Sequence, residues 1–350
     1  MRVRLLPALL SFTFSAAVAA TTEVLKPKVV VVTMFEIGND TGDMPGELQY
    51  WVEREKLERV ISLPQAYHAV RANADGSLIA ILTGVGNTRA AATVMALGLD
   101  PRFDFSQSYW LVAGIAGVDP ADASLASAAW AEWIVNGDLG HEIDSREMPK
   151  NWSTGYVPLR RSRPYELPRV TDDSSQVFRL EPGLVNWAYD LTKDVKLLDS
   201  EGMATRRAEY GGTPNAQRAP FVLKGDTLSS ETFWHGQLLN QWANEWVKYH
   251  TRGAGNYVTT GMEDTGTLQA LTWLARAGRV DVRRTLVLRT GSNFDGPKPG
   301  QTAAESLFGE KLASYSAFIP SLESAYRVGS VVVHELVGNW PKYEKKIPRK

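Results

Sequence analysis

Short apolar runs alternate with helix-length segments along almost the whole chain, and this alternation limits its fold more than any other feature. The runs are VVVVTM (29–34), LIAILT (78–83), YWLVAGI (109–115) and TLVLRT (285–290). They are apolar at consecutive positions, which is typical of central strands that are buried on both faces. The pattern therefore predicts an α/β fold with three α/β/α layers and a central, mostly parallel mixed sheet.

The rest of the chain can be divided by the same criteria. Further strands are predicted at 128–135, 221–224 and 256–260, and helices at 88–99, 177–192, 232–249, 264–277, 303–314 and 320–338. Residues 140–168 are rich in Pro, Ser, Arg and Trp without a clear period, and we expect an ordered excursion or lid there. No linker divides the chain, so residues 21–350 are predicted to form a single domain with this excursion as an insertion.

The first twenty residues have the features of a secretory signal peptide. Two arginines precede an apolar run from Leu5 to about Val18, and Ala17-Val18-Ala19 has the A-x-A pattern of a cleavage site. A membrane anchor is the alternative, but the run is shorter than the roughly 20 residues that a span needs. We expect residues 1–20 to be removed, leaving a periplasmic or secreted protein with no transmembrane segment in the mature chain.

The composition excludes several classes of function. With 38 basic and 39 acidic residues, the formal net charge of -1 provides no long-range field to attract nucleic acid. The chain has no cysteine, and its five histidines lack metal-ligand spacing. A G-x-S-x-G nucleophile motif is also absent from the sequence. We therefore expect no metal, no cofactor and no nucleic-acid partner, and a chemistry based on carboxylates and amides.

Glycines mark the ends of two predicted strands. Gly84 and Gly86 lie in a strand-to-helix turn, but Arg89 stands where a dinucleotide fingerprint needs its third glycine. Gly114 lies at the end of the run 109–115. These glycines either only permit tight turns or allow a small ligand to approach the backbone. Because ligands collect beyond the carboxyl ends of parallel strands, Gly84, Gly86 and Gly114 are candidate ligand contacts in a shared pocket.

Carboxylates and amides follow three of the predicted strands. They are Glu36 after the first strand, Glu263 and Asp264 after residues 256–260, and Asn293 and Asp295 after residues 285–290. Their convergence predicts a polar site above an apolar sheet. Any one of them alone could be a helix cap, and Asp264 is expected to cap the helix that follows it.

These motifs carry a resemblance to a known family. KPKVVVVTMFEIGND, ILTGVGNTRAAAT, WLVAGIAGVDP, GMED and LRTGSNFDGP occur in the order expected for the purine nucleoside permease family, which is similar in fold to nucleoside phosphorylases and nucleosidases. The match covers nearly all of the mature chain. The resemblance implies a purine nucleoside substrate, with Met262 packed on the ribose and Glu263 accepting hydrogen bonds from its 2′ and 3′ hydroxyls.

The resemblance also implies roles in cleaving the N-glycosidic bond. Asn293 stands where nucleosidases have an Asp that protonates the purine at N7, so Asn293 is expected to contact the base and Asp295 is the candidate proton donor. Glu36 lies within a residue or so of the Glu that activates water. Val112 and Ile115 lie where phosphorylases hold phosphate, and neither side chain can bind an oxyanion. Hydrolysis is therefore favoured over phosphorolysis.

A second class of function remains open from the sequence. The family name suggests a non-catalytic nucleoside-binding component that supports nucleoside uptake. Relatives in the superfamily are commonly dimers, trimers or hexamers, so a homo-oligomer is an expectation, although the insertion at 140–168 could block the interfaces of those assemblies.

Overall fold

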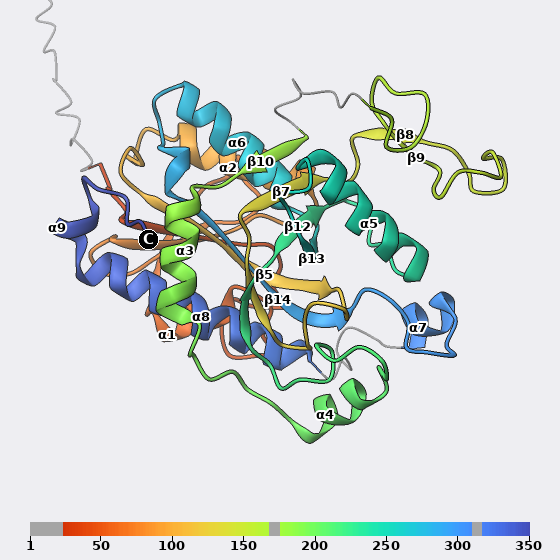
Figure 1. The fold of residues 1–350 in the computed structure, drawn as a ribbon. Coiled ribbons are helices and arrows are strands. Elements are labelled where there is room, and N and C mark those ends of the chain that lie inside the picture. The colour runs from red at the N-terminus through yellow and green to blue at the C-terminus, as the bar shows by residue number, and fades with distance from the viewer. Residues whose placement is uncertain (1–23, 168–175, 310–316) are drawn as a thin grey trace, which may run out of the picture.

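A large mixed sheet lies between two layers of helices in the computed structural model, which describes residues 24–167, 176–309 and 317–350 (Figure 1). The predicted signal peptide lies outside these ranges. One layer holds α1 (Gln49–Arg54), α3 (Pro182–Thr192) and α8 (Phe318–Gly338), which α9 (Trp340–Tyr343) follows. The other holds α2 (Asn87–Leu99), α5 (Gln237–His250) and α6 (Asp264–Arg276). The predicted three-layer α/β architecture is confirmed.

Twelve strands of the described chain form the sheet, in the order β10-β7-β12-β13-β5-β1-β4-β3-β2, with β14 pairing with β5 and β6, and β11 with β6. Their bounds are β1 Val29–Thr33, β2 Arg59–Ile61, β3 Val70–Ala72, β4 Leu78–Leu82, β5 Tyr109–Val118, β6 Ala128–Trp130, β7 Trp133–Asn136, β10 Val177–Arg179, β11 Val222–Lys224, β12 Asp226–Ser229, β13 Tyr257–Gly261 and β14 Thr285–Phe294. All residues of β1 and β4 are buried, as their unbroken apolar runs predict.

Strand β5 organises the centre of the sheet because it has three neighbours. It pairs with β14 from Trp110 to Val118, with β1 in parallel at residues 109–112, and with β13 in antiparallel fashion at Gly117 and Val118. Since β14 occupies one edge, β1 and β13 must share the other. They leave residues 113–116 of that edge without a neighbouring strand, and this gap is where the cavity described below lies.

Several predicted elements differ from those observed. The strand predicted at Ala128–Val135 is two strands, β6 and β7. The chain bends between them because Asp226 Oδ1 accepts the backbone N–H groups of Glu132 at 3.1 Å and Trp133 at 2.8 Å. The helix predicted at 177–192 begins as strand β10, which pairs with β7, and becomes helical only from Pro182.

The later helix predictions differ mainly at their ends. The helix predicted from residue 232 starts at Gln237, after Gly236 with a φ of 132°, and residues 232–234 form part of the cavity wall. Helix α7 (Ala303–Gly309) begins where predicted, and residues 310–314 of that prediction lie outside the described ranges. Strand β12 and helix α4 (Glu201–Ala208) were not predicted.

The predicted excursion is ordered over its described part. It contains the hairpin of β8 (Gly140–Glu142) and β9 (Tyr156–Pro158) and lies beside α5 (Figure 1). The ring of Tyr156 stacks on that of Trp242 with centroids 4.4 Å apart, and Tyr249 donates to the backbone oxygen of Glu166 at 2.8 Å. The excursion is therefore attached to the body of the protein by aromatic contacts.

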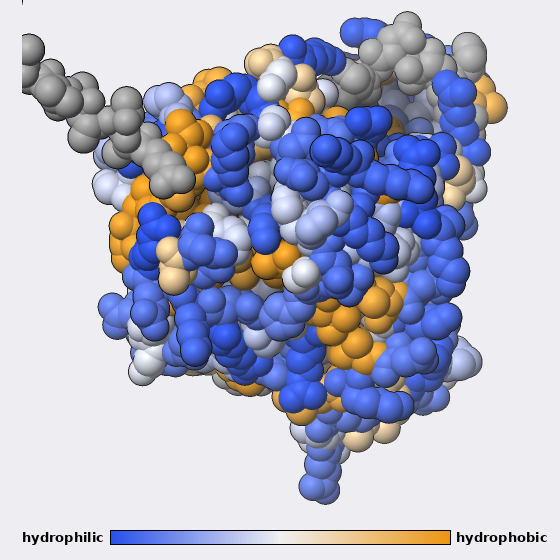
Figure 2. Space-filling view, turned by 90° about the vertical axis from the view of Figure 1, so that its left-hand side faces the viewer, coloured by the Kyte–Doolittle hydropathy of each residue, from blue (hydrophilic) through white to orange (hydrophobic). Residues whose placement is uncertain are grey.

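None of the helices in the described ranges is long and apolar enough to cross a membrane. Hydrophilic residues predominate on the face of the molecule seen in Figure 2, where the apolar residues form separate patches.

Candidate functional site

A cavity of about 280 Å³ lies at the gap beside β5, where β1 and β13 end. Its volume is close to the lower limit of small-molecule sites, and most of its wall is apolar, which is typical of such sites. The lining residues are Met34, Phe35, Glu47, Val85, Ile115, Ala116, Gly117, Thr232, Phe233, Trp234, Thr260, Gly261, Met262, Glu263, Arg289, Ser292 and Asn293. The cavity thus draws residues from five strands or the positions just after them (β1, β4, β5, β13 and β14), and from the segments before α1 and α5.

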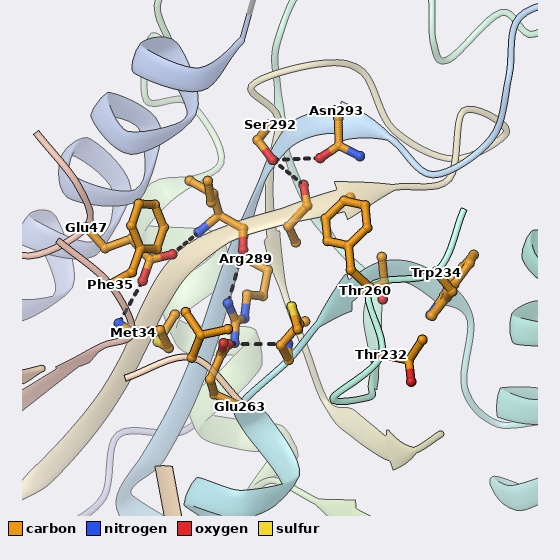
Figure 3. Close-up of a pocket in the computed structure, with 17 residues that line it drawn as sticks. Met34, Phe35, Glu47, Thr232, Trp234, Thr260, Glu263, Arg289, Ser292 and Asn293 are labelled. Carbon is orange, nitrogen blue, oxygen red and sulfur yellow. Dashed lines mark hydrogen bonds and ion pairs between the residues drawn. The ribbon is translucent and has the colours of Figure 1, made fainter. Parts of the chain in front are cut away.

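The gap beside β5 leaves the peptide groups of Ile115 without a strand partner, and two charged side chains take that place. Glu47 accepts the Ile115 N–H at 2.7 Å, and Arg289 donates to the Ile115 carbonyl at 3.0 Å (Figure 3). Buried backbone groups must be paired somewhere, so the interruption of the sheet requires polar partners at this point. The same interruption of the sheet brings the carboxyl group of Glu47 and the guanidinium group of Arg289 to the cavity wall.

Glu47 lies in the cavity wall just before α1. Its other carboxylate oxygen accepts the backbone N–H of Met34 at 2.7 Å. Burial raises the pKa of Glu47 to about 8, and the nearby charge of Glu263 raises it too, while Arg289 and the two backbone N–H groups lower it. Gly114 makes room for this side chain, because a Cβ at Gly114 would collide with Met34 and Glu47. Glu47 is therefore a carboxyl group that can change its protonation near neutral pH.

Glu263 is held from three sides. One oxygen accepts from Arg289 at 2.9 Å and from the Met262 N–H at 3.2 Å, and the other accepts the N–H of Gly86 at 3.3 Å. Burial raises the pKa of Glu263, while Arg289 lowers it. A carboxylate has about four acceptor positions, so Glu263 retains acceptor capacity for donors on a ligand.

Arg289 is fully buried and joins two carboxylates. It donates to Glu263, to Asp264 Oδ1 through Nε at 3.0 Å and to Asp264 Oδ2 through Nη2 at 2.9 Å. The prediction that Asp264 caps the following helix was wrong. Glu263 takes the N-cap position, and Asp264 lies in the first turn of α6 with its carboxylate directed to Arg289. The positive charge in the cavity wall is thus already matched by negative charge.

A bulge in β14 brings two consecutive residues to the cavity. The register with β5 shifts between Gly291 and Asn293, so Ser292 and Asn293 both line the wall although neighbours in a regular strand face opposite sides. The Ser292 hydroxyl lies 3.1 Å from the carbonyl of Ala116 and 2.9 Å from Asn293 Oδ1. These contacts fix the side chain of Asn293 at the wall.

The structure brings together some of the sequence-predicted residues and separates others. Met262, Glu263 and Asn293 line the cavity, whereas Glu36, Asp295 and the three candidate glycines are not among its lining residues. Gly84 and Gly86 adopt φ angles of 80° and 101°, so they permit the turn before α2. Gly86 also donates to Glu263, as described above.

Glu36 and Asp295 have other partners. Glu36 accepts four backbone N–H groups from residues 37–49. Asp295 accepts the hydroxyl of Tyr257 and the side-chain amide of Asn240. Burial and the charge of Asp119 raise the pKa of Asp295 well above its ordinary value. Both carboxylates therefore support structure around the cavity.

Sequence reasoning missed two charged residues of the site. Arg289 stands inside the apolar strand TLVLRT, and a charged residue at a buried strand position is a signal of an internal ion pair. Glu47 follows the first strand by more than ten residues, and no local pattern marks it. No group of three or more His, Asp or Glu side chains within residues 24–167, 176–309 and 317–350 is arranged to hold a metal ion.

Comparison with known proteins gives concordant results. A family model described as purine nucleoside permease matches residues 26–348. A Candida albicans protein named purine nucleoside permease is 30% identical over 329 residues, covering 92% of this chain and 78% of its own length. A Schizosaccharomyces pombe protein named as a probable purine nucleoside permease is 29% identical over 331 residues, covering 91% of each chain.

Among solved structures, the fold is similar to that of 5′-methylthioadenosine/S-adenosylhomocysteine nucleosidase from Helicobacter pylori. The TM-score is 0.53 at 13% identity, with 89% of this chain and 99% of the other covered. At this identity the similarity is one of fold.

Proposed function

The chain belongs to the purine nucleoside permease family, and from this premise we propose that it binds purine nucleosides in the cavity and hydrolyses their N-glycosidic bond. The observation that carries the proposal is the pair of buried carboxylates, Glu47 and Glu263, in the wall of one apolar cavity. In the proposal, Glu263 accepts a hydrogen bond from the sugar, and Glu47 accepts a proton from the attacking water.

In this proposal Glu263 binds the ribose. Its position is fixed by Arg289 and by two backbone N–H groups, so little side-chain freedom is lost when a ligand binds. Three of the roughly four acceptor positions of Glu263 are already taken, so the 2′ or the 3′ hydroxyl of a ribose can donate to the position that remains. Met262 lines the cavity next to Glu263 and provides an apolar surface for the sugar.

Glu47 serves as the general base. In its ionised form it takes a proton from water, and the oxygen of that water forms the new bond to C1′ as the bond from C1′ to the purine nitrogen breaks. The bonding electrons leave with the purine. One amide hydrogen of Asn293 is donated to the carbonyl of Phe294 at 3.1 Å, and the other can bind a nitrogen of the departing base. The base takes its proton from a water molecule, and the hydroxide that remains recovers the proton held by Glu47, which restores the carboxylate.

Charge in the cavity supports hydrolysis over phosphorolysis. Arg289 is the one Lys or Arg among the described lining residues, and it is already paired with Glu263 and Asp264. A phosphate ion would have to lie beside Glu47 and Glu263 without a free cation to balance its charge, whereas a water molecule carries no such cost.

Incubation of the purified protein with inosine or adenosine, with and without phosphate, tests this proposal. We expect free base and ribose at the same rate in both conditions. Formation of base only when phosphate is present, together with ribose 1-phosphate, would replace hydrolysis by phosphorolysis. The inference that the paired charge of Arg289 disfavours phosphate would then be wrong.

A second candidate is a nucleoside-binding component that supports uptake, which the names of the fungal relatives favour. Tight binding of nucleoside with no release of base over many hours would support this role. In that case Glu263 would keep its role as the ribose ligand, and Glu47 would have no catalytic one.

Glu263→Ala should weaken purine nucleoside binding by roughly 10- to 100-fold, because hydrogen bonds to a charged acceptor contribute about 1.5–3 kcal/mol. Isothermal titration calorimetry of the variant measures the change. Binding of a 2′,3′-dideoxynucleoside to the wild-type protein is the matched control, since it removes the same hydrogen bonds from the ligand side. A variant that retained full affinity would remove Glu263 from the ribose site.

A further inference from the structure

We propose that Glu36 is a positioning residue that holds Glu47 at the cavity wall. This inference rests on the proposed function, in which Glu47 acts on water. Glu36 itself is not among the lining residues of the cavity, so its effect must pass through the chain segment that carries Glu47.

The contacts of Glu36 bracket Glu47 on both sides. Its Oε1 accepts the N–H groups of Ile37, at 2.9 Å, and Gly46. Its Oε2 accepts those of Leu48 at 3.0 Å and Gln49 at 2.7 Å. Gly46 precedes Glu47 and the other two residues follow it. These four hydrogen bonds, which we call the Glu36 clamp, therefore fix the backbone immediately before and after the general base.

The clamp also begins helix α1. The N-cap residue of this helix, Leu48, has no side chain that can accept a hydrogen bond from the first turn. Glu36 supplies that acceptor from the end of β1, because it binds the N–H groups of Leu48 and Gln49 that a helix leaves unpaired. The start of α1, and with it the direction in which Glu47 leaves the backbone, is thus set by Glu36.

Close packing in the same place reinforces the clamp. The N–H of Glu47 donates to the carbonyl of Phe35 at 2.9 Å. A Cβ added to Gly46 would lie 2.6 Å from Glu36 Cα and 2.7 Å from the Phe35 oxygen. Real side chains do not approach the backbone so closely, so any residue larger than glycine must push the segment away from Glu36.

The number of donors explains why a carboxylate is needed. An ionised carboxylate accepts about four hydrogen bonds through two oxygens, whereas the amide of Gln has one oxygen and two N–H donors. In Glu36→Gln the amide oxygen can keep the hydrogen bonds from two of the backbone N–H groups. The amide NH₂ group faces the other two N–H groups, and these two hydrogen bonds are lost because donor then meets donor. Glu53 provides a contrast, because within the described part of the chain it accepts one backbone N–H, that of Gly42, at the exposed tip of the same segment.

The test compares Glu36→Gln and Gly46→Ala with the matched control Glu53→Gln. We expect kcat for nucleoside hydrolysis to fall roughly 10- to 100-fold in the first two variants, since small displacements of a catalytic group have effects of this size. The dissociation constant for the nucleoside should stay within about twofold, because the contacts of Glu263 are untouched. Glu53→Gln should retain the wild-type kcat.

A double-mutant cycle distinguishes positioning from general destabilisation. In a Glu47→Gln background, Glu36→Gln should have almost no further effect on kcat, because the group that it positions is already gone. Independent losses that multiply in the double variant would overturn the proposal, as would a wild-type kcat in Glu36→Gln. If Glu36→Gln does not fold, Gly46→Ala replaces it in the same cycle and retains the charge of Glu36.

A measurement that does not need turnover separates this inference from the proposed function. The pH dependence of Tm in wild type, minus that in Glu47→Gln, reports the ionisation of Glu47 in its site between Arg289 and Glu263. The same difference measured in the Glu36→Gln background should be shifted along the pH axis. An unshifted difference would overturn the positioning role, even if the wild-type protein proved unable to cleave nucleosides.

Discussion

Glu47→Gln should lower the rate of purine nucleoside hydrolysis by roughly 10²- to 10⁴-fold, the usual contribution of a general base. The substitution is conservative in shape, since Gln resembles the protonated form of Glu and can still accept one of the N–H groups of Met34 and Ile115. Nucleoside binding should therefore persist. Single-turnover kinetics and calorimetry on the same preparation measure the two quantities.

The pH dependence of hydrolysis by the wild-type protein provides an independent check of this proposal. With a pKa of about 8 for Glu47, kcat/KM should increase with pH and level off above that value, because only the ionised form is a base. Glu58→Gln, at an exposed position in the same region, is the control. Substantial activity in Glu47→Gln with an unchanged pH profile would exclude Glu47 as the base.

Whereas kcat/KM should increase with pH, the free energy of unfolding should decrease as the pH rises. The pKa of Glu47 is raised from 4.5 to about 8 in the folded protein, so the folded state keeps a proton that the unfolded chain releases within that range. The resulting contribution to the free energy of unfolding is fully present below pH 4.5 and is lost as the pH rises to about 8. Glu47→Gln should lack this loss, and urea titrations at several pH values would measure the difference.

Arg289→Met should reduce the free energy of unfolding by about 3–5 kcal/mol, the usual effect of removing one partner from a buried ion pair. The substitution leaves Glu263 and Asp264 buried without their cation and the carbonyl of Ile115 without its donor. Urea denaturation measures the loss. Arg283→Met is the control, because Arg283 is 63% exposed and its pair with Asp281 should contribute less than about 1 kcal/mol.

A compensated variant tests whether charge is the cause. Glu263→Gln and Asp264→Asn, added to Arg289→Met, remove the two uncompensated negative charges and should restore part of the lost stability. An equal or larger loss in the triple variant would show that packing of the Arg289 side chain, rather than charge balance, determines stability at this site.

The sequence predicted the central strands and part of the site well, for a physical reason. An unbroken run such as VVVV can be buried only in the middle of a sheet, and the carboxyl ends of such strands define where a site can form. Met262 and Glu263 directly follow β13, and Asn293 follows the apolar part of β14, so a place near the carboxyl ends of the strands was predictable. These three residues line the cavity, and their roles in binding and cleavage stay predictions.

Other features depend on contacts that local sequence does not encode. Strand β7 departs from β6 because of Asp226, which lies more than ninety residues further along the chain. Glu47 reaches the cavity only because residues 37–46 leave the sheet and return, whereas Glu36 was the nearer carboxylate in sequence. The pairing of Asp264 with Arg289 likewise overrode a local preference for helix capping.

The Glu36 clamp has a practical consequence for protein engineering. Glu36 accepts the N–H groups of both Ile37 and Gly46, so its side chain connects the two ends of the loop 37–46. Residues 41–44 at the tip of this loop are exposed. Exposed loop tips of this kind tolerate inserted sequence, and closing a longer loop adds little entropic cost. A fluorescent label or short peptide placed there would lie a few residues from Glu47 in sequence, with the clamp between the label and Glu47, which makes this tip a suitable attachment point for reporting ligand binding in the cavity.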